Sequence, residues 1–330
     1  MPDRRHALLI LLLLAAAAAV SLASSLAIGS LPLSAADLWR ILCGEEAGVA
    51  GEVVRSLRLP RALAGLACGG LLALSGALMQ LLLKNPLADP YVLGVSGGAA
   101  VGTLLAMLLG LPLLMLQGGA FAGALAAMLL VFGLAHGDGS WTQTRLLLTG
   151  VVVASGCGAG VALILSIAPE SALRGMLFWL MGDLSQVDSP WLPLAVLVAG
   201  LIALLPFARD LGLLARGGQA AQALGVPVAR LRLLIYALAS LFTAVAVSSA
   251  GAIGFVGLVV PHLVRLSMRT SAGNDQRLLL PASALAGGTL LVAADLLARS
   301  IIAPQQLPVG VLTALIGVPV FLYMLASQAE

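Results

Sequence analysis

The stretch RLPRALAGLACGGLLALSGALMQLLLKNPLADP, residues 58–90, decides the fold class of this chain. Its residues 62–83 carry no charge and lie between Arg61 and Lys84. A helix of about 20 apolar residues crosses the hydrocarbon core of a bilayer with all its backbone hydrogen bonds made internally. The stretch therefore predicts a membrane-spanning helix, followed by a connection that begins at Asn85.

Eight further apolar runs extend this pattern along the chain. Hydrophobic residues make up 61% of the 330 residues and charged residues only 9%, against about 25% charged in an ordinary soluble domain. We expect an all-α, polytopic membrane protein in which residues 1–330 form one transmembrane domain and the first run is an uncleaved span, not a signal peptide. The eight runs cover residues 7–28, 91–110, 113–135, 146–168, 190–208, 233–252, 278–298 and 308–327.

Residues 253–268 form a tenth candidate span, although they are short and contain Pro261, where we expect a helix break. Lys and Arg tend to stay on the cytoplasmic side of a membrane. If residues 253–268 cross the membrane, the basic residues of 209–232 and those of 265–277 lie on the same side. If they do not cross, the two groups lie on opposite sides. About ten spans with both termini inside place the following basic residues in the cytoplasm: Arg4, Arg5, Lys84, Arg145, Arg209, Arg216, Arg230, Arg232, Arg265, Arg269 and Arg277.

Small residues inside the spans predict close packing of helices. Glycine pairs occur at 69–70, 97–98 and 287–288, and Gly156, Gly158 and Gly160 follow one another in the fifth span. We interpret all of them as helix contacts, because backbones can approach closely only where side chains are absent.

Residues that could form a catalytic site are not grouped in the sequence. The three histidines are far apart, no HExxH motif occurs, and no GxxxxGK[ST] loop is present to hold the phosphates of ATP. We therefore expect no ATPase site, no metal site and no cofactor in this chain. A net charge of only +3 gives no basis for nucleic-acid binding.

Ionisable residues at membrane depth are scarce, and their number bears on the energy source of any transport. Asp295 lies four residues before Arg299, so we interpret it as part of an i,i+4 ion pair rather than a proton relay. An ion-coupled secondary transporter is the main alternative to an ATP-driven one and is disfavoured by the lack of buried charge. An intramembrane enzyme is disfavoured by the lack of a nucleophile–base pair.

Two connections carry most of the remaining charge. The first external loop holds Arg40, Arg55, Arg58 and Arg61 beside acidic residues, which fits either a solvated loop or a docking surface for an acidic external partner. Residues 209–232, with Arg on both flanks, predict two short helices that stop near Gly225, a position suited to positive φ. Such a compact, basic segment is suited to contact with a cytoplasmic partner.

Six segments in this order resemble the permease subunits of bacterial ATP-binding-cassette importers for iron-siderophores, haem and cobalamin, the FecCD-type permeases of type II importers. The resemblance runs nearly end to end, and its ten-helix protomer agrees with the count that follows from charge. The segments are RLPRALAGLACGGLLALSGALMQLLLKNPLADPYVLGVSGGAA (58–100), TRLLLTG (144–150), FWLMGDLS (178–185), AQALGVPVARLR (221–232), GAIGFVGLVVPHLVRL (251–266) and LPVGVLTALIGVPVFLYML (307–325).

The resemblance implies roles for particular residues. It implies a cytoplasmic gate formed by Asn85, Leu87, Gln143 and Thr144. It implies docking of an external binding protein on Arg58, Arg61 and Arg299. It implies coupling to an ATPase through residues 214–228 and their neighbours, with contacts from Arg216, Gln219, Ala221, Gly225 and Arg230. FWLMGDLS would form a short external helix near the pore mouth.

The resemblance also implies partners and a location. A second copy, or a similar permease, would complete the pore, and two cytoplasmic ATP-binding subunits would hold ATP and Mg²⁺. A periplasmic or lipid-anchored binding protein would deliver the cargo to the bacterial inner membrane, where alternating access would move it inward. Iron-siderophore, haem and cobalamin all remain open as the cargo, because such a pore is expected to be lined by small and apolar groups.

Overall fold

A computed structural model describes residues 2–29, 31, 33–44, 48–135, 142–185, 187, 189–268 and 275–327, and within these ranges the chain is helical with no strand. The helices are α1 (Pro2–Ala27), α2 (Ala35–Leu42), α3 (Gly48–Glu52), a π-helix (Val53–Arg58), α4 (Leu59–Leu83), a 3₁₀ turn (Pro90–Leu93), α5 (Val95–Leu108), α6 (Leu113–Ala135), α7 (Gln143–Ile167), α8 (Glu170–Met181), α9 (Trp191–Leu204), α10 (Ala208–Arg216), α11 (Gly218–Ala223), α12 (Val228–Ala250), α13 (Val256–Ser267), α15 (Gln276–Ala298) and α16 (Val309–Ser327).

Each of the ten predicted spans contains one helix of the bundle. Within the described ranges, six helices are long and apolar enough to cross a membrane, and α9 with α10 forms a further pair bent by 71°. Helices α5, α13 and α16 are shorter and apolar. The all-α, polytopic fold is therefore confirmed.

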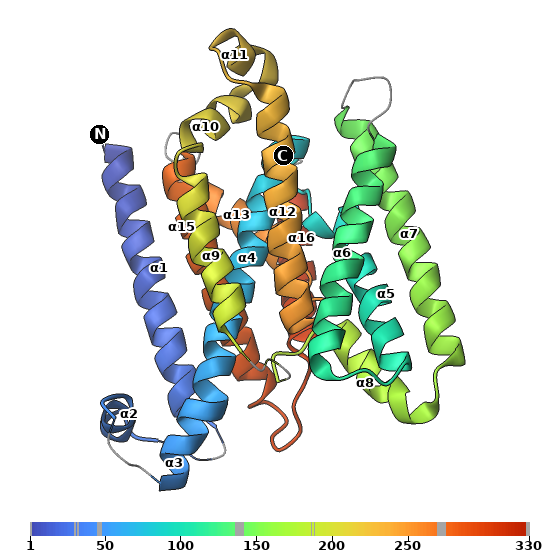
Figure 1. Ribbon diagram of the computed structural model, residues 1–330. Helices are drawn as coiled ribbons and strands as arrows, with labels where there is room; N and C mark the ends of the chain where they lie inside the picture. The colour runs from blue at the N-terminus through green and yellow to red at the C-terminus, as the bar shows by residue number, and fades with distance from the viewer. Residues whose placement is uncertain are drawn as a thin grey trace.

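Helix α4 forms the centre of the bundle (Figure 1). It packs along α12 and α15 and also contacts α1, α9 and α13, so nearly every residue between Ala62 and Leu82 is buried. Helix α1 lies at one edge of the bundle, and α5, α6 and α7 lie at the opposite edge (Figure 1). The stretch that is most apolar in sequence thus becomes the core around which later helices assemble.

Glycines set how closely α4 meets its neighbours. A Cβ atom on Gly69 would lie 2.3 Å from the carbonyl oxygen of Gly287 on α15, and one on Gly76 would lie 1.8 Å from that of Gly257 on α13. The predicted packing role is confirmed where Gly69 meets Gly287. Gly156 and Gly158 make no such contact within the described part of this chain, because nothing outside their own helix lies within 4 Å of a Cβ built there.

The break between α12 and α13 falls at residues 251–255, not at Pro261 as expected. Gly251 has a φ of 72° and Phe255 a φ of 68°, and between them the Tyr91 hydroxyl donates to the Ile253 carbonyl and accepts from the Ile253 amide, at 2.8 and 3.0 Å. Pro261 lies inside α13. It removes only the helical bond to the Gly257 carbonyl, which α4 approaches at the Gly76 crossing.

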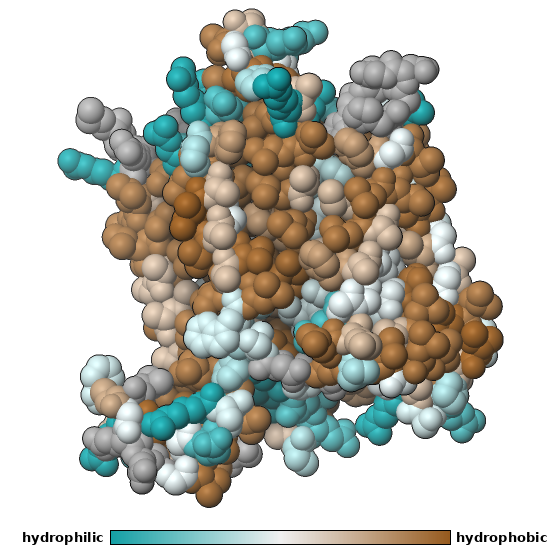
Figure 2. All heavy atoms as spheres, viewed as in Figure 1, coloured by the Kyte–Doolittle hydropathy of each residue, from teal (hydrophilic) through white to brown (hydrophobic). Residues whose placement is uncertain are grey.

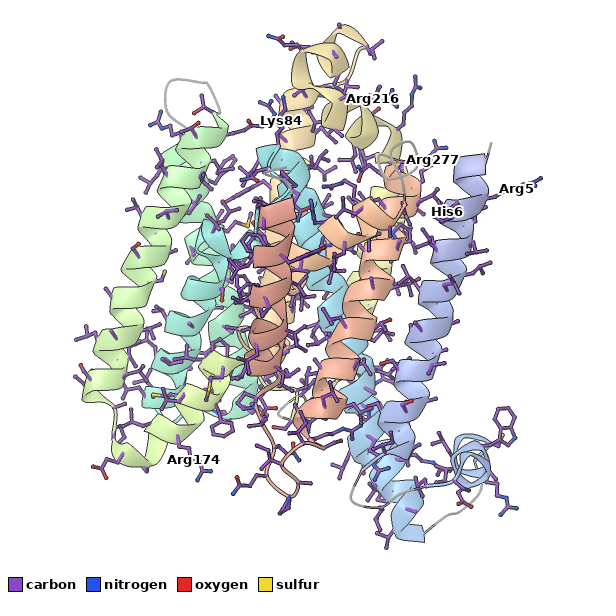
Figure 3. All side chains as sticks on the ribbon, turned by 180° about the vertical axis from the view of Figure 1, so that it is seen from behind. Arg5, His6, Lys84, Arg174, Arg216 and Arg277 are labelled. Atoms are coloured by element: carbon purple, nitrogen blue, oxygen red, sulfur yellow. The ribbon has the colours of Figure 1, made fainter. Side chains whose placement is uncertain are left out.

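Polar side chains gather at both ends of the bundle around a broad apolar belt (Figure 2). Arg5, Lys84, Arg216 and Arg277 lie at one end and Arg174 at the other (Figure 3). Four of the basic residues predicted to share a side therefore lie together, and Arg269 of the same prediction falls outside the described residues. The ends are called cytoplasmic and external below, following the topology predicted from charge.

Candidate docking, gate and coupling sites

Arg58 lies where the π-helix joins α4, and it is 5% exposed. Its Nη1 donates to the carbonyls of Leu26 and Ala27 at 2.7 and 3.2 Å, and its Nη2 donates to that of Leu31 at 2.7 Å. The last carbonyls of a helix lack partners within the helix. Arg58 supplies those partners for α1, so its guanidinium faces the protein here rather than an external partner.

Arg61 forms a buried ion pair with Asp295 of α15. Its Nε lies 3.1 and 3.0 Å from the two carboxylate oxygens, and its Nη2 lies 2.8 Å from Oδ1. Nη1 donates to Oε1 of Gln306 at 2.8 Å, and Asp183 lies 3.9 Å from Nη2. The expected i,i+4 ion pair between Asp295 and Arg299 is present, with Nε of Arg299 4.0 Å from Oδ2, but the shorter and bidentate partner of Asp295 is Arg61.

Arg299 reaches from the end of α15 to α1. Its Nη2 donates to the Ser25 hydroxyl at 2.8 Å and to the Ser25 carbonyl. Its Nε is buried without a hydrogen-bond partner, 4.0 Å from the nearer Asp295 oxygen. Arg299 therefore keeps donor capacity that the described contacts do not use.

A cavity of about 740 Å³ opens at the external end beside these arginines. Arg61 contacts two carboxylates, those of Asp295 and Asp183. The cavity is lined by three guanidinium groups, so these five charged groups together carry one excess positive charge. Its polar lining can accept a further carboxylate. The lining includes Arg58, Arg61, Arg299, Ser56, Ser185 and Gln306.

The predicted gate residues surround the cytoplasmic end of α4. Lys84 ends the helix with a φ of 48°, and the Asn85 side chain accepts a hydrogen bond from the Leu87 amide at 2.9 Å across Pro86. An Asn side chain that bonds the backbone two residues on forms a compact turn. Leu87 packs against the small cluster of Leu258 and Val259 on α13, and Phe321 of α16 packs against the same cluster.

Gln143 and Thr144 begin α7 next to the same turn. Nε2 of Gln143 donates to the Leu82 carbonyl at 2.8 Å, which ties the start of α7 to the last turn of α4. Thr144 is exposed. The structure thus brings Asn85, Leu87 and Gln143 together, and the role of these residues as a gate stays a prediction.

The predicted pair of short helices is confirmed. Helices α10 and α11 meet at Gly217 and project beyond the cytoplasmic end of the bundle (Figure 1). Leu211 and Leu214 hold α10 in the main core, and Gly225 has the expected positive φ, 84°. The bundle therefore carries a rigid projection rather than a loose loop.

The projection exposes most of the residues predicted to contact an ATPase. Arg216, Gln219, Gly225 and Arg230 are exposed. Ala221 is fully buried in the core, so it cannot present a surface to a partner as expected. Ala221 anchors α11 instead. Its small side chain lets this short helix pack closely against the bundle.

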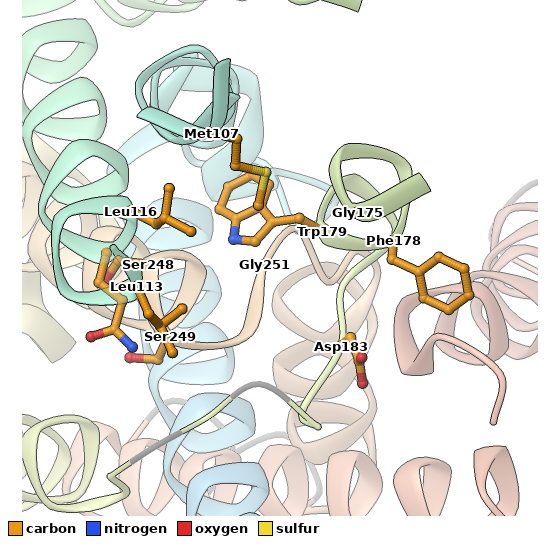
Figure 4. Close-up of a pocket in the computed structure, with 11 residues that line it drawn as sticks. Met107, Leu113, Leu116, Gly175, Phe178, Trp179, Asp183, Ser248, Ser249 and Gly251 are labelled. Carbon is orange, nitrogen blue, oxygen red and sulfur yellow. The ribbon is translucent and has the colours of Figure 1, made fainter. Parts of the chain in front are cut away.

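Helix α8 is the short external helix expected from FWLMGDLS. It ends at Gly182, whose carbonyl accepts from the Gly310 amide at 3.3 Å, while the Asp183 amide donates to Ala250 at 2.9 Å. Trp179 and Asp183 line a pocket of about 80 Å³ between α8, α5, α6 and the end of α12 (Figure 4). Backbone bonds thus link α8 to both α12 and α16.

Sequence reasoning missed the polar contacts between distant helices. Nε2 of Gln80 donates to the Leu258 carbonyl at 2.9 Å, and Oε1 of Gln80 accepts from Nη1 of Arg265 at 3.4 Å. A glutamine inside an apolar span is itself a signal, because its amide needs partners in hydrocarbon. No comparable signal paired Arg61 with Asp295.

The chain is similar to known proteins over nearly its whole length. The profile of the FecCD transport family matches residues 11–327. The chain is 46% identical over 279 residues to the cobalamin import system permease protein BtuC of Halobacterium salinarum, covering 84% of this chain and 74% of that protein. It is 40% identical over 315 residues to the hemin transport system permease protein HmuU of Yersinia pestis, covering 93% and 92%.

A solved structure shares the fold. It is an inward-facing conformation of a metal-chelate type ABC transporter, with a TM-score of 0.84, 32% sequence identity, and coverage of 96% of this chain and 99% of that one.

Proposed function

Because this chain belongs to the FecCD transport family, and is thus a permease subunit of an ATP-binding-cassette importer, we propose that its cargo is a metal chelate of the cobalamin, haem or iron-siderophore class. Two copies of the chain, or this chain and a similar permease, enclose the pathway. Two cytoplasmic ATP-binding subunits hold ATP and Mg²⁺, and an external binding protein delivers the cargo. The chain itself hydrolyses no ATP.

The observation that carries the proposal is the projection formed by α10 and α11. Buried Leu211, Leu214 and Ala221 fix it to the bundle, while Arg216 and Gly225 are exposed. A partner that moves this rigid projection also moves α12, because α12 follows α11 directly. ATP binding in the partner would in this way shift the helices that contact α4.

The gate and docking roles complete the mechanism. Asn85, Leu87 and Gln143 close around the end of α4, where a change in the position of α13 or α16 alters the packing of Leu87. At the opposite end, the cavity lined by Arg61 and Arg299 receives carboxylates of the binding protein. Both sites lie at the ends of α4, which joins them rigidly.

Reconstitution tests this proposal. The chain is purified alone and with an ATP-binding subunit of the same transporter class, and both preparations are placed in vesicles. We expect ATP hydrolysis only in the second, and uptake of one chelate among cobalamin, haemin and a ferric siderophore once a binding protein is added. Hydrolysis by the chain alone, or uptake driven by a proton gradient without ATP, would refute it.

A further inference from the structure

The external connection between α1 and α4 contains an amphipathic helix. Leu38 and Ile41 of α2 are buried in a small apolar cluster with Leu26 of α1, Val54 and Ala62. This cluster is separate from the main core and lies where α1 ends and α4 begins. One face of α2 is therefore seated on the protein, and the packing decides which residues face outward.

Hydrogen bonds hold α2 in this orientation. The Ser34 hydroxyl accepts from the Asp37 amide at 3.2 Å and caps the first turn. Nη2 of Arg55 donates to the Ile41 carbonyl at 2.9 Å in the last turn. Arg58 ties down the end of α1 just before it. Two of the four arginines of the loop thus face inward to fix the helix.

The outward face of α2 presents Trp39 and Arg40. Trp39 is 71% exposed, and Arg40 beside it is also exposed. The other face of α2 packs on the protein, but no apolar partner among the described residues covers the Trp39 ring. None of the residues that line the external cavity belongs to α2, so Trp39 does not extend the cavity surface.

The neighbouring surface is the outer flank of α1. Only 11% of the apolar window of α1 is buried, and α1 lies at the edge of the bundle opposite α7. Helix α2 sits beside the external end of α1 (Figure 1). Helix α2 therefore lies at the external edge of the flank of α1 that meets the lipid. The exposed apolar residues of this flank run from the cytoplasmic end of α1 to its middle and include Leu8, Leu9, Leu12, Leu13 and Val20.

We propose that α2 is an interfacial anchor, with Trp39 inserted at the boundary between headgroups and acyl chains of the outer leaflet and Arg40 on a lipid phosphate. Tryptophan concentrates at this depth because its ring is apolar while its N–H needs a polar partner. The Asp37 and Arg40 charges balance, so the partner is a phospholipid surface in general and not only an anionic one.

Fluorescence quenching by brominated phosphatidylcholine tests the anchor. The full chain carries Trp141, Trp179 and Trp191 replaced by Phe, which leaves Trp39 as the only tryptophan. A second protein keeps only Trp191, which is 67% exposed at the first turn of the apolar helix α9 and serves as a control for membrane depth. We expect lipid brominated near the headgroup end of its chains to quench Trp39 at least as strongly as Trp191, and more than lipid brominated near the chain ends.

The proposal fails if brominated lipid leaves Trp39 unchanged while aqueous iodide quenches it fully. It also fails if only an added binding protein shifts its emission. Should the triple substitution impair folding, the difference in quenching between the unaltered chain and Trp39→Phe isolates the same signal with one exposed substitution. The test uses no ATPase or cargo, so it is independent of the transport assignment.

Discussion

Arg61 and Asp295, 234 residues apart in the sequence, form the bidentate ion pair that joins α4 to α15 near the external end of the bundle. Asp295 is 2% exposed, and Gln306 takes one further donor of the guanidinium. A carboxylate alone at this depth would be costly. The pair therefore neutralises both charges and links the central helix to the wall of the external cavity.

Removing one partner of this pair should destabilise the protein. Asp295→Asn removes the bidentate charged acceptor of Arg61 and leaves the Asp183 carboxylate, 3.9 Å from Nη2, as its remaining described acidic contact, and breaking a buried pair in this way costs about 3 kcal/mol. We expect a clear fall in the thermal unfolding temperature of the detergent-solubilised chain. Glu170→Gln, at an exposed acid on α8, is the matched control and should shift it little. Equal unfolding temperatures for the two variants would contradict the role of the pair.

Adding one methyl group at a helix crossing should be as damaging as losing a charge. Gly76→Ala would place its Cβ 1.8 Å from the Gly257 carbonyl, so α4 and α13 must separate, with an expected cost of about 1–3 kcal/mol. Gly133→Ala on α6 meets no atom within 4 Å and should be neutral or slightly stabilising. Thermal unfolding compares the two, and a neutral Gly76→Ala would show that the crossing is looser than described.

The arginines of the docking prediction should separate by function. Arg58→Lys loses the fork that holds three carbonyls, so we expect lower stability but an unchanged salt dependence of binding-protein association. Arg61→Gln also breaks the Asp295 pair and should lower stability as well. Because it removes a charge that lines the cavity, we expect association of the folded protein to weaken by up to about fivefold at low salt, with less loss at high salt. Surface plasmon resonance at two ionic strengths measures both. Identical salt dependence in the two variants would remove Arg61 from the docking surface.

Bulk at Gly225 should uncouple the ATPase without unfolding the permease. A Cβ there meets no atom within 4 Å, so a side chain can leave the backbone at this position, and Gly225→Trp bears the strain of a φ of 84°. Gly225→Asn tolerates that conformation and controls for strain. We expect the tryptophan variant to insert normally but to lose ATPase association in co-purification. Full association and normal transport by Gly225→Trp would exclude this turn from the contact.

The long apolar runs of the chain were enough to predict the ten helices of the bundle. Ten apolar runs became ten helices because backbone in hydrocarbon must bond within its own segment. The predicted division between residues 91–110 and 113–135 agrees with the gap between α5 and α6, where Gly110 and Pro112 lie. The error at Pro261 has a physical reason: a proline inside a helix removes one backbone hydrogen bond, and here the helix continues on both sides of it.

The sites could be predicted only as local motifs. The turn at Asn85 and the positive φ at Gly225 depend on neighbouring residues, so the sequence contains their cause. The partner of Arg61 depends on how α4 and α15 pack, and the inward face of Ala221 depends on how α11 seats on the core. Such contacts between distant segments leave no periodic trace in one sequence.

The central place of α4 also constrains how the protein is made. Ser75 bonds the Ala239 carbonyl and lies 2.7 Å from the Thr243 hydroxyl, and Gln80 bonds the Leu258 carbonyl. At 5–20 residues per second, Ala239 leaves the ribosome roughly 10 to 30 s after Ser75. During that interval α4 resides in the membrane before α12 and α13 exist, so the Ser75 hydroxyl must bond its own helix backbone and the Gln80 amide must find another polar partner.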